Sequence, residues 1–246
     1  MAALSFTKMR DRLSTTETAA HRDLLQKFVE ASKLRPEVLD PTAMLGLIMS
    51  TISGAGDTTA TTITASIYYL LHQESDLERL LAELAGAGIL GLPKHEQVRN
   101  LPFLNAVIKE SLRIFAVLTW PMERAVPSGG VKITGTYFPE STSVGCMPAA
   151  VHMNTKVFGD DAAVFRPLRW LEADKDRLHR MEAAQIGFSR GRRACIGQHI
   201  ATMQMRKVIP LLLTTFKVLS DLVEEVVFSL KSIVDESGRS AGIFRC

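Results

Sequence analysis

The sequence predicts a mainly α protein with one small β-region. Apolar residues recur with helical spacing over most of the chain, whereas Pro and Gly are concentrated in residues 120–148. The chain has 246 residues, of which 46% are hydrophobic and 22% are charged. This composition is ordinary for a globular protein, and the length allows a core of useful size.

The longest expected helix covers residues 42–72 and follows Asp40, its expected N-cap. The segment is apolar on nearly every side, so we expect it to be buried. It carries one acid, Asp57, and is crowded with Thr, Ser and Gly, which favours a core helix over a membrane span. Its glycines each disfavour a helix interior by roughly 1 kcal/mol relative to alanine, which indicates that something approaches the backbone closely. They are Gly46, Gly54 and Gly56.

Further helices are expected on both sides of the β-region. They cover residues 18–34, 75–86, 101–115 and 198–216. Ser75 is the expected N-cap of the second of these, Gly86 and Gly88 end it, and Pro210 is expected to kink the last. Residues 120–148 are expected to form short strands, and residues 155–187 an irregular loop with brief helical pieces.

Charge and cysteine content exclude several functions. The net charge of +3 is too small to indicate nucleic-acid binding, and no dense block of Lys and Arg occurs. The three cysteines, Cys146, Cys195 and Cys246, are far apart and odd in number, so a disulfide framework or a zinc site is not indicated. A reducing compartment follows from this usage. The first residues lack the apolar run of a signal peptide.

One cysteine stands in an unusual setting. The stretch GFSRGRRACIGQHIA, residues 187–201, places Cys195 in a loop rich in Gly and Arg at the start of a helix. Arginines and a helix N-terminus both favour thiolate over thiol. A thiolate can act as a nucleophile, a redox sensor or a metal ligand, and a structural cysteine beside a basic patch remains an equal alternative. No Cys/His/Asn triad supports a hydrolase.

The segment FSRGRRACIG resembles the haem-binding signature of the cytochrome P450 family, F-x-x-G-x-R-x-C-x-G. The fixed positions are Phe188, Gly191, Arg193, Cys195 and Gly197. The resemblance implies that the cofactor is haem b, iron protoporphyrin IX, and that Cys195 is the proximal ligand of its iron. It also implies that Arg193 contacts a haem propionate. Ser189 stands where many members carry glycine.

The segment GAGDTTA, residues 54–60, resembles the oxygen-activation motif of the same family. The resemblance implies that Thr58 hydrogen-bonds the activated oxygen and that Asp57 helps to relay protons to it. It also accounts for the glycines, because haem and oxygen would lie against this helix. From the residues alone, an internal cap or a Thr side chain bonded back to its own helix is the alternative.

The segment ESLR resembles the E-x-x-R motif of the family. Periodicity alone places Glu110 and Arg113 on the solvated face of their helix. The resemblance instead implies a buried structural triad with Arg169, in the segment FRPLRWL, where Leu168 replaces the usual glutamate. By the same resemblance Arg124 is directed at a haem propionate, with a plain surface arginine as the alternative.

The resemblance runs from about residue 20 to 219 and corresponds to the C-terminal half of the cytochrome P450 fold. We expect residues 1–246 to be a single partial domain with a divergent tail at about 220–246. His152 fits a histidine that is frequent in the family, and no chemistry is assigned to it. Because family members are longer, much apolar surface is expected to lie open.

The resemblance implies a haem-thiolate monooxygenase that inserts one oxygen atom from O2 into an organic, lipophilic substrate. The alternative is a truncated, non-catalytic haem-binding fragment. The expected electron donor is an NADPH-dependent reductase, with Arg190 and Arg192 as docking candidates, and no nucleic acid is expected as a partner. Intact relatives lie on the endoplasmic reticulum membrane through an N-terminal anchor. The chain shows no anchor, so a cytoplasmic location is expected.

Overall fold

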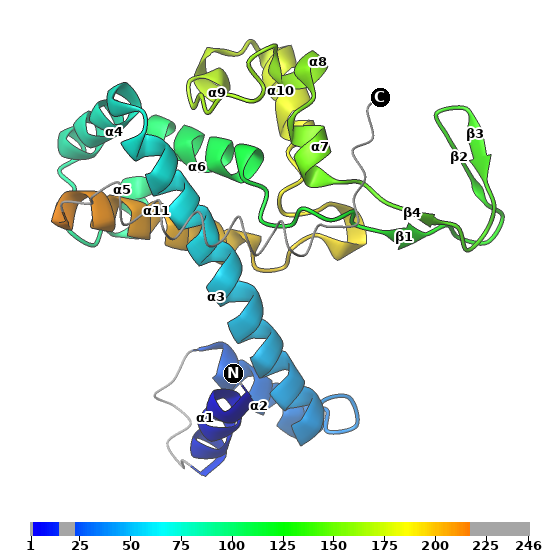
Figure 1. Ribbon diagram of the computed structural model, residues 1–246. Coiled ribbons are helices and arrows are strands. Elements are labelled where there is room, and N and C mark those ends of the chain that lie inside the picture. The colour runs from blue at the N-terminus through cyan, green and yellow to red at the C-terminus, as the bar shows by residue number, and fades with distance from the viewer. Residues whose placement is uncertain (1, 15–22, 217–246) are drawn as a thin grey trace. The chain divides into compact units, whose positions relative to one another are not determined.

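A computed structural model describes residues 2–14 and 23–216 of the chain (Figure 1). The chain divides into two compact units, Met1–Thr58 and Thr59–Cys246. The helices and the few short strands confirm the predicted mainly α fold with a small β-region. The divergent tail expected at about 220–246 lies outside the described residues.

The first unit is built from two short helices and the beginning of a long one. Helix α1 covers Ala2–Ser14, α2 covers Leu24–Leu34, and α3 covers Pro41–Leu71 and continues into the second unit. The carboxylate of Asp40 accepts a hydrogen bond of 2.7 Å from the backbone N–H of Ala43, as its predicted capping role requires. The contact between the helices is apolar and contains Met9, Val29, Met44 and Ile48.

The middle of α3 is exposed. Residues 53–57 are exposed and Thr58 is half-buried, so the prediction that the whole segment is buried is wrong for this stretch. A Cβ atom on Gly46, Gly54 or Gly56 would meet no protein atom within 4 Å, so no close protein neighbour explains these glycines. In the part of the chain that the structure describes, no helix is both long and apolar enough to cross a membrane.

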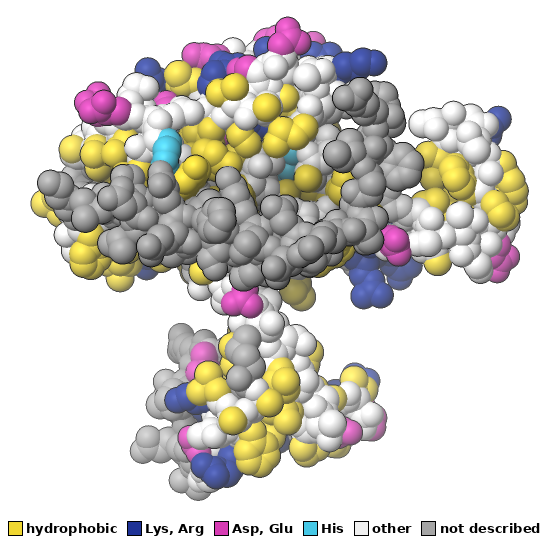
Figure 2. All heavy atoms as spheres, in the orientation of Figure 1, with side chains coloured by type: hydrophobic (Ala, Val, Ile, Leu, Met, Phe, Trp, Pro, Cys, Tyr) yellow, Lys and Arg dark blue, Asp and Glu magenta, His cyan; other side chains and the backbone are white. Residues whose placement is uncertain are grey.

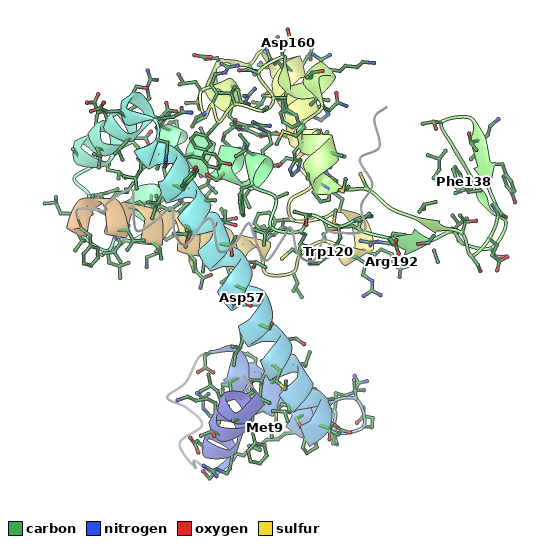
Figure 3. The ribbon with its side chains drawn as sticks, in the orientation of Figure 1. Met9, Asp57, Trp120, Phe138, Asp160 and Arg192 are labelled. Carbon is green, nitrogen blue, oxygen red and sulfur yellow. The ribbon has the colours of Figure 1, made fainter. Side chains whose placement is uncertain are left out.

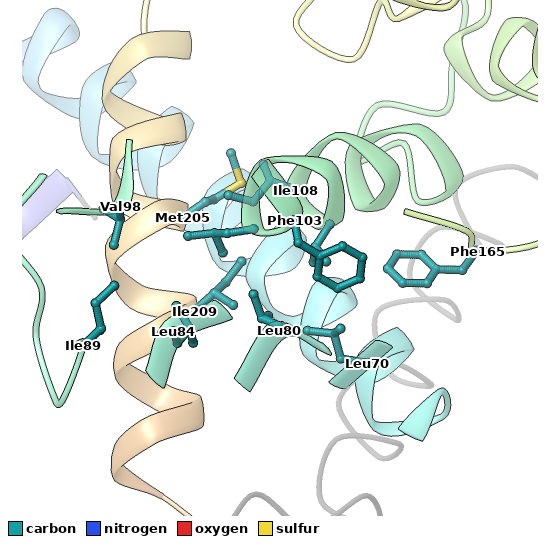
Figure 4. Packing of buried hydrophobic residues seen from close by; sticks show 12 residues of the cluster. Leu70, Leu80, Leu84, Ile89, Val98, Phe103, Ile108, Phe165, Met205 and Ile209 are labelled. Carbon is teal, nitrogen blue, oxygen red and sulfur yellow. The ribbon is translucent and has the colours of Figure 1, made fainter. Parts of the chain in front are cut away.

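The main core of the second unit lies among three helices (Figure 4). These are α4 (Glu74–Gly86), α6 (Pro102–Ile114) and α11 (Gln198–Thr215), and the short α5 (His95–Val98) joins them. Buried residues of the core include Leu70, Leu80, Leu84, Ile89, Val98, Phe103, Leu104, Val107, Ile108, Phe165, Met205 and Ile209. The apolar face predicted for the helix at 101–115 is therefore largely inside.

Two local predictions for α4 had different outcomes. The helix begins at Glu74 after Gln73, so the prediction that Ser75 is its N-cap is wrong. Gly88 follows the end of α4 with φ of +66°, a left-handed conformation that glycine adopts without strain.

A side chain of α4 also caps the next long helix, because the two carboxylate oxygens of Glu83 accept hydrogen bonds from the backbone N–H groups of Phe103 and Leu104 at 2.8 Å each. Glu83 thus caps α6, which begins without a side-chain cap of its own.

The small β-region consists of two antiparallel pairs. Strand β1 (Arg124–Ala125) pairs with β4 (Ser143–Val144), and β2 (Val131–Ile133) pairs with β3 (Thr136–Phe138). The two residues between β2 and β3, Thr134 and Gly135, both have positive φ, as in the type I′ turn that suits a two-residue hairpin. The β2–β3 hairpin extends beyond the β1–β4 pair (Figure 1).

A second, smaller core lies on another side of α6. Around it are α8 (Thr155–Phe158), α9 (Arg169–Glu172) and α10 (Lys175–Ala184), and α7 (Pro148–His152) precedes them in the chain. Its buried members are Ala106, Phe158, Ala162, Trp170 and Met181. The ten-residue α10 is longer than the brief helical pieces predicted for 155–187, and Asp174 caps it by accepting the N–H of Arg177 at 2.8 Å. Helix α6 is therefore covered on two sides.

Candidate functional site

Glu110, in α6, is fully buried and accepts five hydrogen bonds. One carboxylate oxygen accepts from Arg113 Nη2 at 2.7 Å, Arg169 Nε at 2.9 Å and the backbone N–H of Arg166 at 2.9 Å. The other accepts from Arg113 Nε at 2.9 Å and Trp170 Nε1 at 2.8 Å. The solvated position that periodicity predicts for this carboxylate is wrong, because α8–α10 cover the polar side of α6.

Each of the two arginines whose side chains bind Glu110 uses all five of its own N–H donors. Beside its two bonds to Glu110, Arg113 donates to the carbonyl oxygens of His152, Ala162 and Val164 at 2.6–3.2 Å. Arg169 donates to Glu110, to Asp161 Oδ1 at 2.9 Å and to three backbone carbonyls of residues 158–164. Buried charges are tolerated when paired and fully hydrogen-bonded, and the network holds the irregular segment between α8 and α9 in place.

Asp161 is a member of this network that the sequence did not reveal. Its carboxylate accepts from Arg169 Nη1 at 2.9 Å and from Arg166 Nε at 2.6 Å. Burial alone would raise the pKa of Asp161, but the hydrogen bonds and charges of Arg169 and Arg166 outweigh it and leave this pKa lowered. Asp161 therefore supplies a second carboxylate in a segment where Leu168 has replaced the usual glutamate.

His152 lies at the end of α7 and is fully buried. Its Nδ1 lies 2.9 Å from the carbonyl oxygen of Arg113, and its Nε2 lies 3.0 Å from the backbone nitrogen of Ile186. Burial, and to a smaller extent the positive charge of Arg113, lower the pKa of His152 to about 4, although the hydrogen bond to the Arg113 carbonyl opposes this change. The imidazole is therefore neutral near pH 7.

Cys195 lies in a loop that backbone hydrogen bonds close. Its N–H donates to the carbonyl of Phe188 at 2.8 Å, and the N–H of Ser189 donates to the carbonyl of Ile186 at 2.8 Å. The backbone is left-handed at Ser189, with φ of +59°, and at Gly191, with φ of +70°. The thiol is free and exposed, three residues before α11 begins.

Arginines surround this loop. Arg192 and Arg193 lie in a turn of 3-10 helix, Gly191–Arg193, and are exposed. Arg124, in β1, donates from Nη2 to Ser189 Oγ at 3.4 Å, so the structure brings this strand to the loop. Figure 2 shows Lys and Arg side chains gathered at this edge of the second unit, and Figure 3 labels Arg192 there. Within the described residues no carboxylate pairs with Arg124 or Arg193.

Asp57 and Thr58 lie in α3 (Figure 3). Thr58 Oγ1 donates to the carbonyl of Gly54 at 2.7 Å, one turn earlier, which is the back-bond considered as the alternative for this motif. Asp57 is exposed. Both residues end the first unit, whereas Cys195 belongs to the second.

The fold is that of a mainly α protein with two short antiparallel strand pairs, and comparison with known proteins identifies its family. The family model for cytochrome P450 matches residues 3–235. The chain belongs to the cytochrome P450 family. Haem is the cofactor that this family implies.

Fungal relatives show the extent of the match. The cytochrome P450 monooxygenase ACRTS1 of Alternaria alternata is 36% identical over 220 residues, which are 88% of this chain and 58% of that protein. For pkfB of Emericella nidulans the identity is 38% over 80% of this chain and 39% of that protein. For easK of Aspergillus fumigatus the identity is 41% over 68% of this chain and 51% of that protein. The chain thus spans about two fifths to three fifths of these relatives.

The residues of the loop fit a haem group. A thiolate at Cys195 would be a soft donor of the kind that binds haem iron. Arg124 and Arg193 are two cations without an acidic partner in the described part, and guanidinium groups bind carboxylates such as propionates well. A Cβ atom at Gly197 would lie 3.9 Å from the Cys195 sulfur, so Gly197 is a direct neighbour of the donor atom.

Proposed function

We propose that this chain is the thiolate-ligating portion of a cytochrome P450 monooxygenase. The observation that carries the proposal is the exposed Cys195 thiol, held in a backbone-closed loop whose sequence matches the family signature at its five fixed positions. When bound, haem b supplies the activation of molecular oxygen for insertion of one oxygen atom into an organic, lipophilic substrate.

Residues around the thiol serve to hold the cofactor. Arg193 and Arg124 bind the haem propionates, since both are exposed and neither is paired with a carboxylate in the described chain. Gly191 permits the left-handed turn that returns the chain toward Cys195. Phe188 packs against the main core and so fixes the start of the loop, and Gly197 leaves space beside the sulfur.

Asp57 and Thr58 are proposed to handle protons. The hydroxyl of Thr58 donates a hydrogen bond to its own helix, and the carboxylate of the neighbouring Asp57 is exposed, so both are groups of the kind that relay protons. Glu110, Arg113 and Arg169 are proposed to be a structural triad, because burial leaves them no access to a substrate. Electrons are proposed to come from an NADPH-dependent reductase that docks near the exposed Arg192.

The carbon monoxide difference spectrum of the reduced, haem-loaded full chain tests this proposal. We expect a band of the thiolate-ligated type that Cys195→Ser abolishes. Cys146→Ser is the matched control, because Cys146 is the other exposed free thiol among the described residues, and it should leave the band unchanged. Absence of haem uptake, or a band that survives Cys195→Ser, would overturn the proposal. Uptake without turnover in the presence of reductase and NADPH would favour the non-catalytic alternative.

A further inference from the structure

The hydrogen bonds of His152 fix its tautomer. The carbonyl of Arg113 can only accept, so His152 Nδ1 must carry a proton and donate it. The backbone nitrogen of Ile186 can only donate, so Nε2 must be unprotonated and accept. The imidazole therefore joins two backbone segments that lie far apart in the sequence, and each of its nitrogens has a defined role.

The segment that begins the Cys195 loop lies along the last turn of α6. Gln185 Nε2 donates to the carbonyl of Lys109 at 2.8 Å. A Cβ atom on Gly187 would come within 3.4 Å of the carbonyl oxygen of Leu112, so the chain passes close to the helix there. The last carbonyls of a helix have no partner within the helix, and His152 satisfies the one at Arg113.

From Ile186 the connection continues into the loop through backbone bonds. The carbonyl of Ile186 accepts the N–H of Ser189, and the carbonyl of Phe188 accepts the N–H of Cys195, each at 2.8 Å. Among the described residues, the hydrogen bonds of the His152 ring go to Arg113 and Ile186 and not to Cys195. Its effect on Cys195 therefore passes through the backbone at residues 186–188.

We propose that His152 is a positioning residue for the Cys195 ligand, because its imidazole fastens the backbone of Ile186 to the end of α6 and so sets where the ligand loop begins. The inference rests on the proposed role of Cys195 as the iron ligand. The element that anchors the loop is the same helix that carries Glu110 and Arg113, so the buried ion network and the ligand loop share one support.

Two substitutions separate the two bonds of the ring. In His152→Gln the amide oxygen reaches the place of Nε2 and still accepts from Ile186. In His152→Asn the shorter amide reaches the place of Nδ1 and still donates to Arg113, but the Ile186 N–H loses its acceptor. In the full chain without haem, we expect the Ile186 amide to exchange hydrogen about 5–30-fold faster in His152→Asn than in the native protein, and close to the native rate in His152→Gln.

The spectrum of the haem-loaded chain supplies the second measurement. The thiolate-type fraction of the carbon monoxide complex should fall in His152→Asn and be restored in His152→Gln, which keeps an acceptor for the Ile186 N–H. Native behaviour of His152→Asn in both measurements, or equal loss in both variants, would overturn the proposal.

Nitrogen NMR of the native chain gives a test that needs no variant. His152 should show a protonated Nδ1 and an unprotonated Nε2. The opposite tautomer would exclude the two hydrogen bonds by which the ring joins Arg113 to Ile186. If the native chain forms no thiolate-type band, the proposed role of Cys195 fails. The exchange rate of the Ile186 amide and the tautomer of His152 still test separately whether the ring holds the backbone at Ile186.

Discussion

Arg113 and His152 exchange two hydrogen bonds. Arg113 Nη1 donates to the backbone carbonyl of His152 at 2.8 Å, and the ring of His152 donates from Nδ1 to the backbone carbonyl of Arg113 at 2.9 Å. Each side chain therefore satisfies the main chain of the other in a fully buried place. Because the two bonds hold both backbones, a substitution of either residue should loosen the end of α6 and the end of α7 together.

The first prediction concerns the buried carboxylate. Glu110→Gln should lower the free energy of unfolding by about 3–5 kcal/mol, because it leaves the guanidinium groups of Arg113 and Arg169 buried without full compensation. Urea unfolding followed by circular dichroism measures the change. Glu182→Gln is the control. Glu182, in α10, forms an ion pair of 2.6 Å with Lys109, the neighbour of Glu110 in α6, but both side chains are half-exposed. Such an exposed pair contributes about 1 kcal/mol or less. Equal losses in the two variants would contradict the buried network.

The second prediction concerns pH. His152 has an ordinary pKa of 6.5 when exposed and a pKa of about 4 in the folded chain. Above pH 6.5 the ring is neutral in both states and adds no pH dependence. Between pH 6.5 and 4 the unfolded chain binds a proton that the folded chain does not, so the free energy of unfolding should fall by about 3 kcal/mol over this window.

Urea titrations at several pH values test this dependence, with His152→Gln as the variant that cannot titrate. The native protein should lose stability relative to the variant as the pH falls through the window. Asp161, whose pKa is lowered, has the same sign but acts at lower pH: its contribution is present above its ordinary value of 3.8 and is lost as the pH falls below it. Parallel curves for native protein and variant between pH 6.5 and 4 would refute the role of the ring.

Local sequence signals predicted the elements whose cause is local. The helix at 101–115, the cap at Asp40 and the small β-region follow from apolar spacing, capping chemistry and turn residues, and the structure has them. The prediction of Ser75 as the N-cap is wrong because a helix start with several polar candidates is defined only to within a residue or two.

The burial of Glu110 and the role of Asp161 could not be derived from local patterns. Helical periodicity reveals one apolar stripe, whereas α6 is covered on one side by α4 and α11 and on the other by residues of the segment 157–184. The resemblance implied the triad but not Asp161, Trp170 or the backbone of Arg166, because these contacts depend on the path of an irregular segment.

The third prediction concerns the capping of α6 by Glu83. Because both carboxylate oxygens accept backbone N–H groups, Glu83→Leu should leave two donors without a partner and lower the free energy of unfolding by about 1–3 kcal/mol. Glu83→Gln retains one acceptor and should lose less. Denaturation of the two variants measures this order, and an equal or reversed order would mean that the cap adds little.

The last prediction concerns Ser189, whose backbone has φ of +59°. A non-glycine residue in this left-handed region is strained by roughly 1–2 kcal/mol, and glycine, which many family members carry here, is not. Ser189→Gly should therefore raise the free energy of unfolding by about 1 kcal/mol, after the greater freedom of glycine in the unfolded chain is subtracted. Ser189→Ala is the matched control: like glycine it removes the hydroxyl that accepts from Arg124 Nη2, but it retains the Cβ atom and the strain. Urea unfolding of the three proteins should place Ser189→Gly above the native chain and Ser189→Ala at or below it. A glycine variant no more stable than the alanine variant would show that the loop relaxes the strain in another way.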